Sequence, residues 1–209
     1  MQRIKKDALF VIDGSYLLYR SFYAIRPLTT STGIPSQATF GFARAIKKLI
    51  DDFDPSSMVV VWDSKKRGFR YEIYEAYKGT RQAPPSDLFI QKEYILKFLD
   101  AIGMAHLTVD GVEGDDVIAA LAQKYQDRQV VLVCPDKDMY QLLSETVLIF
   151  DPFKDRVIDR ENFKAEQGFD STKVPFFYAL LGDASDNIPG VKGIGKKTAA
   201  DLVSRSIYL

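Results

Sequence analysis

The chain has a single cysteine and a single histidine, and these two scarcities exclude several kinds of chemistry. One thiol cannot form an intramolecular disulfide or a site built from several thiolates, and the apolar run around Cys134 predicts a buried structural residue. The one histidine, His106, lies in an alternating segment typical of a half-buried strand. Serine–histidine catalysis, histidine-ligated zinc and histidine-based nuclease mechanisms are therefore disfavoured.

An excess of charge and a long hydrophobic run are also missing. Lysine plus arginine equals aspartate plus glutamate at 28 each, so a nucleic-acid partner must be argued from local clusters of charge. No stretch approaches membrane-spanning length, and the first apolar run is too short for a signal peptide. With 209 residues, of which 46% are hydrophobic, we expect a folded cytoplasmic protein of one domain, or of one domain plus a small appendage.

Three apolar runs rich in β-branched residues predict buried strands, at residues 8–12, 58–62 and 130–134. A weaker strand candidate covers residues 105–109. Helical patterns alternate with these strands, at residues 37–53, 88–103 and 115–125. The sequence therefore predicts an α/β fold with a mostly parallel central sheet flanked by helices.

The pattern changes in the last third of the chain. A hairpin is expected around Asp151 and Pro152, and two short helices are expected from Lys173 onward, on either side of a glycine-rich loop. We therefore expect a core over residues 1–159 and a small helical appendage over residues 160–209.

Carboxylates follow the strand candidates. Because the carboxyl ends of parallel strands meet at one edge of a sheet, these acids should converge there. A single aspartate after a strand is commonly a turn or helix-cap residue, but several acids at one edge would repel each other strongly without a divalent cation. There are seven such acids: Asp13, Asp63, Glu113, Asp115, Asp116, Asp136 and Asp138.

A site made only of oxygen ligands suits Mg²⁺ or Mn²⁺ better than zinc. More acids than one ion needs suggests two ions, an arrangement that recurs in phosphodiester cleavage and requires no side-chain base. The scarcity of histidine is consistent with this chemistry.

A basic and aromatic segment follows the second strand candidate. Tyr71, Tyr74 and Tyr77 recur at a spacing of three, which predicts one face of a helix. Cations can follow phosphates and tyrosines can stack on bases, whereas the alternative is a solvated helix whose tyrosines pack on the core. The position directly after Asp63 favours nucleic-acid binding. The basic residues are Lys65, Lys66, Arg67, Arg70, Lys78 and Arg81.

The stretch "GVKGIGKKTA", which begins at Gly190, fits a helix–hairpin–helix motif. Backbone N–H groups at the start of the second helix favour a phosphate, and Lys196 and Lys197 add positive charge. A plain helix–helix turn is the alternative interpretation.

Together the motifs "IDGSYLLYRSFYA", "WDSKKRGFRYEIYEAYKGTR", "EGDDVIAALA", "PDKDMYQL" and "LLGDASDNIPGVKGIGKKTA" resemble the 5′ nuclease (flap endonuclease, or 5′–3′ exonuclease) domain of the bacterial DNA polymerase I family. The resemblance implies a PIN-like nuclease core with a helix–hairpin–helix appendage. It also implies a structure-specific 5′–3′ exonuclease and flap endonuclease that cleaves DNA, and RNA primers, in replication and repair.

The resemblance assigns roles to individual residues. One metal ion would lie among Asp13, Asp63, Glu113, Asp115 and Asp116, and the second among Asp136, Asp138, Asp183 and Asp186. The catalytic cations Arg70, Lys78 and Arg81 would reach the scissile region from an arch at about residues 65–100 that single-stranded 5′ ends thread. DNA contacts are expected from Tyr19, Arg20, Lys65, Lys66, Arg67, Tyr77, Gly190, Gly193, Gly195, Lys196 and Lys197, with a K⁺ ion implied at the hairpin.

Three departures from the family pattern bear on these expectations. Cys134–Pro135 replaces the usual Thr-Gly and removes a backbone donor, and Gly114 replaces an alanine. The chain stops at Leu209 where the family continues with more helices, so a polymerase fragment or a shortened stand-alone nuclease is expected. A branched-DNA-binding module without catalysis is the alternative function, whereas a PIN-type ribonuclease would lack the glycine hairpin and the arch.

The resemblance also implies partners and a place in the cell. The expected partners are branched or 5′-flapped DNA, RNA primer–DNA hybrids and a polymerase domain in the same or another chain. We expect a monomer without membrane contact, in the cytoplasm of a bacterium and at its nucleoid.

Overall fold

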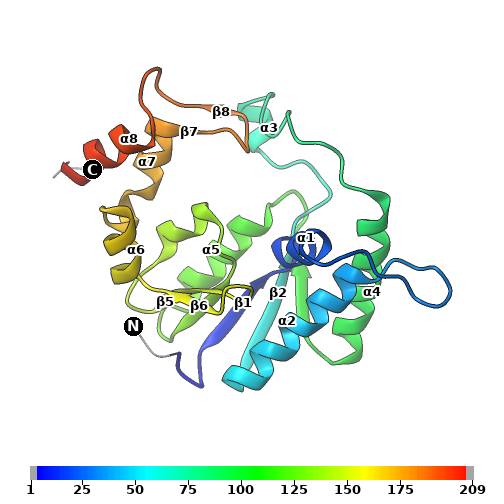
Figure 1. Ribbon diagram of the computed structural model, residues 1–209. Coiled ribbons are helices and arrows are strands. Elements are labelled where there is room, and N and C mark those ends of the chain that lie inside the picture. Colours follow the sequence, from blue (N-terminus) through cyan, green and yellow to red (C-terminus); the bar gives the residue numbers. More distant parts are fainter. Residues whose placement is uncertain (1–3, 206–209) are drawn as a thin grey trace.

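The structure, a computed structural model, describes residues 4–205 and is built around one twisted six-stranded sheet (Figure 1). The strand order is β3-β2-β1-β4-β5-β6; the first five strands are parallel and β6 is antiparallel to β5. This confirms the predicted α/β class. Residues 1–3 of the expected core and residues 206–209 of the expected appendage lie outside the described part. The strands are β1 (Leu9–Asp13), β2 (Ser57–Trp62), β3 (Ala105–Thr108), β4 (Val130–Val133), β5 (Val147–Asp151) and β6 (Arg156–Ile158).

Helices cover both faces of the sheet, and alternate strand residues supply the two apolar layers (Figure 1). Phe10 and Ile12 of β1 pack toward α1, α2 and α4, whereas Leu9 and Val11 pack toward α5, α6 and α7. The helices are α1 (Gly14–Ala24), α2 (Gln37–Phe53), α3 (Arg70–Ile73), α4 (Ser86–Ala101), α5 (Gly114–Lys124), α6 (Arg160–Gln167), α7 (Val174–Leu181) and α8 (Lys196–Arg205), with 3₁₀ helices η1 (Lys137–Leu142) and η2 (Ser171–Lys173). Within residues 4–205, no helix is long and apolar enough to cross a membrane.

The three predicted helices of the core are present within two residues of their expected bounds, as α2, α4 and α5. Helix α1 was not predicted. It begins directly after β1, and Asp13 caps it by accepting a hydrogen bond from Tyr16 N at 2.9 Å. The aspartate that ends the strand thus also starts the helix, so the sequence offers no separate turn between the two elements.

The predicted hairpin around Asp151 is β5–β6, and the two predicted short helices are α7 and α8. The sequence did not reveal a two-stranded ribbon between them, β7 (Gly182–Asp183) with β8 (Ile188–Pro189). Ala199 and Val203 of α8 join the same apolar cluster as α5 and α7, so this region packs against the core.

The expected helical face of three tyrosines is wrong. Helix α3 is a single turn that ends at Ile73 and buries none of its residues, and the chain after it runs through successive turns, with Lys78 at φ 53°. An isolated turn without apolar packing cannot propagate a helix. Tyr71 and Tyr77 nevertheless meet edge to face, with ring centroids 5.3 Å apart.

Gly190 allows β7 and β8 to lie close together. A Cβ atom at Gly190 would lie 2.2 Å from Leu181 O and 2.6 Å from Gly182 N, whereas one at Gly195 would meet no described heavy atom within 4 Å. Gly190→Ala should therefore lower the melting temperature by an amount equivalent to about 1–3 kcal/mol, while the control Gly195→Ala should leave it nearly unchanged. Thermal unfolding of both variants checks this, and equal melting temperatures would contradict it.

Candidate metal and nucleic-acid site

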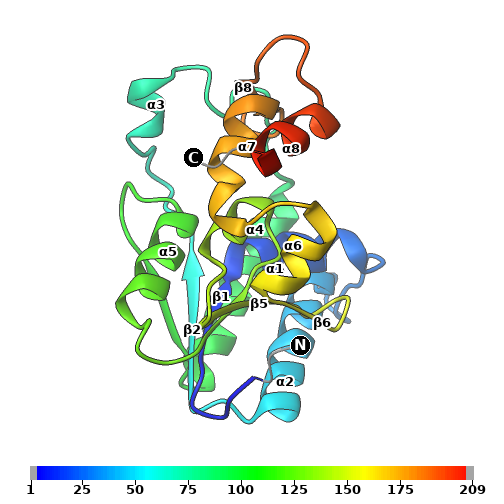
Figure 2. The same ribbon diagram turned by 90° about the vertical axis from the view of Figure 1, so that its left-hand side faces the viewer.

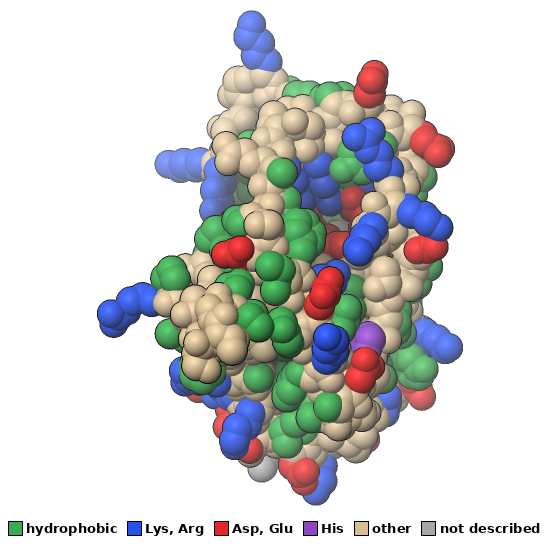
Figure 3. All heavy atoms as spheres, turned by 90° about the vertical axis from the view of Figure 1, so that its right-hand side faces the viewer, with side chains coloured by type: hydrophobic (Ala, Val, Ile, Leu, Met, Phe, Trp, Pro, Cys, Tyr) green, Lys and Arg blue, Asp and Glu red, His purple; other side chains and the backbone are tan. Residues whose placement is uncertain are grey.

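The predicted acids lie at the carboxyl edge of the sheet, where strands end and the following helices begin. Asp13 ends β1, and Asp63 follows β2. Asp136 caps η1 after β4 by accepting a hydrogen bond from Asp138 N at 3.1 Å. Glu113 occupies the N-cap position of α5, with Asp115 and Asp116 in its first turn, where the positive end of the helix stabilises negative charge. From one side of the molecule, basic side chains surround a recess with acidic ones inside it (Figure 3).

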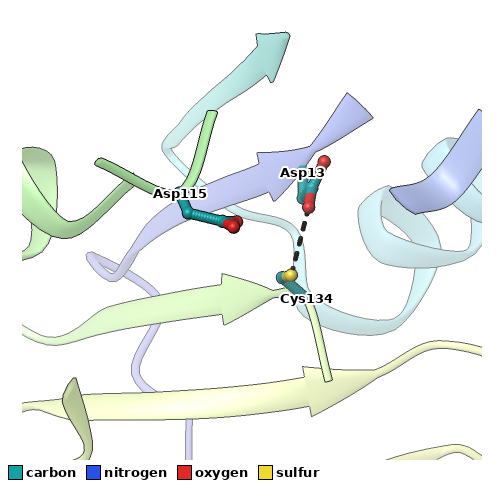
Figure 4. Close-up of side chains that lie close together, drawn as sticks. All are labelled: Asp13, Asp115 and Cys134. Atoms are coloured by element: carbon teal, nitrogen blue, oxygen red, sulfur yellow. Dashed lines mark hydrogen bonds between the residues drawn. The ribbon is translucent and has the colours of Figure 1, made fainter. Parts of the chain in front are cut away.

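One cluster joins Asp13, Asp115 and Cys134, whose ligand atoms all lie within 4.8 Å of one another (Figure 4). Burial raises the pKa of Asp13 to about 6, helped by the negative charges of Asp63 and Asp136. Burial and the neighbouring carboxylates raise the pKa of Asp115 to about 8. Burial and repulsion between the carboxylates therefore make negative charge at this cluster costly unless a cation balances it.

Cys134 is buried, in agreement with the structural role expected for it, but its position beside the acids was not foreseen. Its Sγ donates a hydrogen bond to Asp13 Oδ2 at 3.2 Å (Figure 4). Burial and the negative charge of Asp13 raise the pKa of the thiol well above its usual value, so Cys134 is a neutral donor here.

Cys134 should for this reason resist thiol reagents in the folded protein, because the thiolate is the reactive form and the sulfur is inaccessible. Colorimetric titration with a disulfide reagent should detect one thiol after denaturation and almost none before it. Rapid reaction of the native protein would contradict the described packing.

A second cluster joins Asp138, Asp183 and Asp186, again with ligand atoms within 4.8 Å of one another. Burial and the nearby Asp136 raise the pKa of Asp138 to about 6. Burial alone would raise the pKa of Asp183, but hydrogen bonds from Lys137 and Ser185 outweigh it and lower that pKa. The ribbon β7–β8 thus delivers two carboxylates to η1.

Three basic residues of the segment expected to form the arch contact the acids. Arg70 makes two hydrogen bonds of 2.7 Å to the carboxylate of Asp116 and lowers its pKa. Lys78 Nζ lies 2.8 Å from Glu113 Oε1. In addition, Arg81 forms an ion pair with Asp186. The three cations expected to act in catalysis therefore meet the carboxylate edge.

Tyr77 differs from the expected base-stacking residue. It is only 5% exposed, and its hydroxyl lies 3.0 Å from both Glu113 Oε2 and Asp186 Oδ2. A phenol has one proton, so it donates to one carboxylate at a time. Tyr77 connects α5 to the β7–β8 turn, a role that its spacing in the sequence could not reveal.

Five of the nine expected ligands fall into the two clusters within residues 4–205, and the other four form hydrogen bonds or ion pairs elsewhere at the edge. Asp63 Oδ1 accepts a hydrogen bond of 2.7 Å from Gly114 N, so it joins β2 to α5. Glu113, Asp116 and Asp136 have the partners described above.

Most of the expected DNA contacts are exposed. Tyr19 on α1 is 40% exposed, and the Arg20 guanidinium lies 5.4 Å from the ring centroid of Phe153. Gly193 has φ +84°, which explains the glycine in the loop before α8. Gly190 instead packs against backbone. Further exposed side chains are Lys65, Lys66, Arg67, Lys196 and Lys197; Lys66 pairs with Asp110, and Arg67 lies over the ring of Tyr71.

The donor set fits a divalent metal. Buried or half-buried carboxyl groups with raised pKa values lie together here, and a divalent cation would relieve their mutual repulsion. Carboxylate oxygens are the ligands that Mg²⁺ and Mn²⁺ prefer. The second cluster borders a cavity of about 910 Å³, which also exposes Asp115.

Comparison with known proteins identifies the family. Residues 8–168 match the family described as 5′-3′ exonuclease, N-terminal resolvase-like domain, and residues 169–207 match the 5′-3′ exonuclease C-terminal SAM fold. A 5′-3′ exonuclease of Aquifex aeolicus is 40% identical over 199 residues, covering 94% of this chain and 69% of that protein. The thermostable DNA polymerase I of Thermus thermophilus is 40% identical over 200 residues, covering 95% of this chain but only 24% of the polymerase.

A solved structure described as T5 5′-exonuclease with bound divalent zinc ions has a similar fold. Its TM-score is 0.75 at 25% identity, covering 94% of this chain and 74% of that one. The fold match over 94% of this chain and the acidic clusters that could hold a metal ion agree with the sequence comparison. The chain therefore belongs to the 5′–3′ exonuclease family of metal-dependent nucleases.

Proposed function

We propose that this chain is a structure-specific 5′–3′ exonuclease and 5′-flap endonuclease that hydrolyses DNA phosphodiester bonds with two divalent ions. The observation that carries the proposal is the pair of carboxylate clusters on one sheet edge, with the cations of the arch beside them. The carboxylates would bind metal ions, and the neighbouring cations would bind the phosphate of the substrate.

The first ion would be held by Asp13 and Asp115, with Asp63, Glu113 and Asp116 around it, and the second by Asp136, Asp138, Asp183 and Asp186. Bound Mg²⁺ or Mn²⁺ would supply Lewis acidity and a nucleophilic water. The chain itself would hold the ions in place, because Tyr77 and the backbone of Gly114 fix the positions of the surrounding carboxylates.

The cations of the arch would act on the substrate. Arg70, Lys78 and Arg81 now neutralise carboxylates, and once metal ions do so these three side chains would be available to the scissile phosphate. Fixed cations at that point stabilise the negative charge that develops during phosphoryl transfer. We therefore assign catalysis to these three residues.

The expected substrates are 5′-flapped or branched DNA and RNA primer–DNA hybrids. The single-stranded end would pass through the arch. The duplex would lie against the loop between α7 and α8, where the turn at Gly193 and the side chain of Lys196 suit a phosphate. A K⁺ ion bound at this loop would be a further contact for the duplex. Because this region covers about a quarter of the related polymerase, a polymerase domain in the same chain is a proposed partner. We propose a monomer that acts at the bacterial nucleoid.

A flap-cleavage assay tests the proposal. A DNA duplex with a labelled 5′ flap should give a short product in Mg²⁺ or Mn²⁺ and none in EDTA, and the same flap made of RNA tests primer removal. A flap whose 5′ end is closed into a hairpin is the matched control for threading. Binding of the flap without any metal-dependent product would contradict the nuclease and favour the branched-DNA-binding alternative.

A further inference from the structure

The cavity beside the second carboxylate cluster is lined by both charged and apolar residues. The charged lining includes Asp138, Asp183, Asp186 and Arg70, and the apolar lining comes from α3, η1, α7 and β8. Helices α3, α5 and α7 stand around this region in Figure 2. Its volume of about 910 Å³ lies within the range of small-molecule sites.

The apolar side chains at this cavity are unusually accessible to water. Ile73 is 78% exposed, Ile188 is 43% exposed and Tyr74 is 39% exposed. They come from the arch and from β8, so two separate segments present apolar surface next to buried carboxylates. An occupant of this cavity would need a charged end and a flat or apolar end.

Tyr178 is the aromatic residue that α7 contributes to the cavity. Its ring packs edge to face on Phe177, with centroids 5.1 Å apart, and Lys137 Nζ lies 5.3 Å from its centroid. Lys137 in turn forms an ion pair with Asp183 of the second cluster. The ring is thus held by the core and is linked through one lysine to the proposed metal ligands.

We propose that this cavity binds the base of an unpaired nucleotide adjoining the scissile phosphate, with Tyr178 as the side chain on which the base stacks. A nucleotide has the required two ends, since its phosphate belongs with the metal ligands and Arg70 while its base suits Ile73, Tyr74 and Tyr178. Stacking on tyrosine accepts every base, which agrees with cleavage by structure and not by sequence. This inference rests on the proposed nuclease function.

Fluorescence of 2-aminopurine tests the contact directly. Two flap substrates carry the reporter on either side of the scissile phosphate and are bound with Ca²⁺ in place of Mg²⁺, under conditions in which no product forms. Stacking in the wild-type complex should lower the fluorescence of one of them. Tyr178→Leu keeps apolar packing but removes the ring, so the decrease should be lost, whereas Tyr178→Phe should retain it.

The matched control is Phe176→Leu. Phe176 is an exposed aromatic residue of the same helix, two positions away and outside the cavity lining, so this variant should behave as wild type. Thermal unfolding of each variant separates loss of the contact from loss of the fold. An unchanged fluorescence decrease in folded Tyr178→Leu would overturn the inference.

An abasic nucleotide completes a double-mutant cycle. Removing the base at the responding position should weaken wild-type binding about tenfold, and it should weaken Tyr178→Leu binding much less, because that contact is already absent. Additive losses would overturn the inference even if flap cleavage proceeds normally. Absence of metal-dependent cleavage would instead refute the proposed function, so the two failures are distinguishable.

Discussion

Replacing Asp13 by asparagine should reduce flap cleavage by roughly a thousandfold or more, because a metal ion that contributes several kcal/mol to the transition state would lose its central ligand. DNA affinity should change little, since Asp13 is buried at the end of β1 and contacts no expected DNA-binding residue. Single-turnover cleavage in Mg²⁺ and binding in EDTA measure the two effects separately.

Asparagine is the informative substitution at this position. Its amide oxygen can still accept the hydrogen bond from Tyr16 N, so the cap of α1 is preserved, whereas Asp13→Ala would also cost about 1 kcal/mol in capping. Asp151→Asn is a matched control, because Asp151 is a buried acid at the end of β5, another parallel strand of the same sheet, and lies in neither cluster. Similar activity of the two asparagine variants would contradict a metal role for Asp13.

Replacing Asp115 by asparagine should abolish cleavage and at the same time stabilise the protein without metal. The pKa of Asp115 is about 8 in the folded protein and 3.8 as the ordinary value, so the folded state holds the extra proton between about pH 4 and pH 8. Stability in EDTA should therefore fall as the pH rises through this window. Removing the charge should raise the melting temperature at pH 8.5 by several degrees, since a few kcal/mol corresponds to about 5–10 °C at this chain length.

Metal should reverse the pH dependence in the wild type. Mn²⁺ replaces the proton, so it should raise the wild-type melting temperature more at pH 8.5 than at pH 6, where protons compete with it. Asp115→Asn should show a smaller response to Mn²⁺ at both values. Scanning calorimetry in EDTA and in Mn²⁺ provides the comparison, and a variant less stable than wild type in EDTA at pH 8.5 would contradict the described burial.

The sheet and the acidic edge could be predicted because each depends on local sequence. Continuous apolar runs mark β1, β2 and β4, and the acids that follow them meet because parallel strands end at one edge. The family motifs then added Asp183 and Asp186, which follow no predicted strand. Their position depends on the short ribbon β7–β8, which is too short for a periodic signal.

The remaining features depend on contacts between distant residues. The hydroxyl of Tyr77 meets Asp186, 109 positions away, and Arg70 meets Asp116, 46 positions away. A spacing of three tyrosines carries no information on such partners, so the helix predicted for that segment was wrong. Cys134 was correctly predicted to be buried, but its hydrogen bond to Asp13 spans 121 positions and has no local signal.

The central claim is that the two carboxylate clusters hold two ions on one edge of the sheet. Isothermal titration calorimetry of the protein with Mn²⁺ at pH 8 tests it most directly. The expected result is two ions for each wild-type chain, with one ion lost in Asp115→Asn and the other lost in Asp186→Asn. A single ion in the wild type, or two ions in either variant, would contradict the claim.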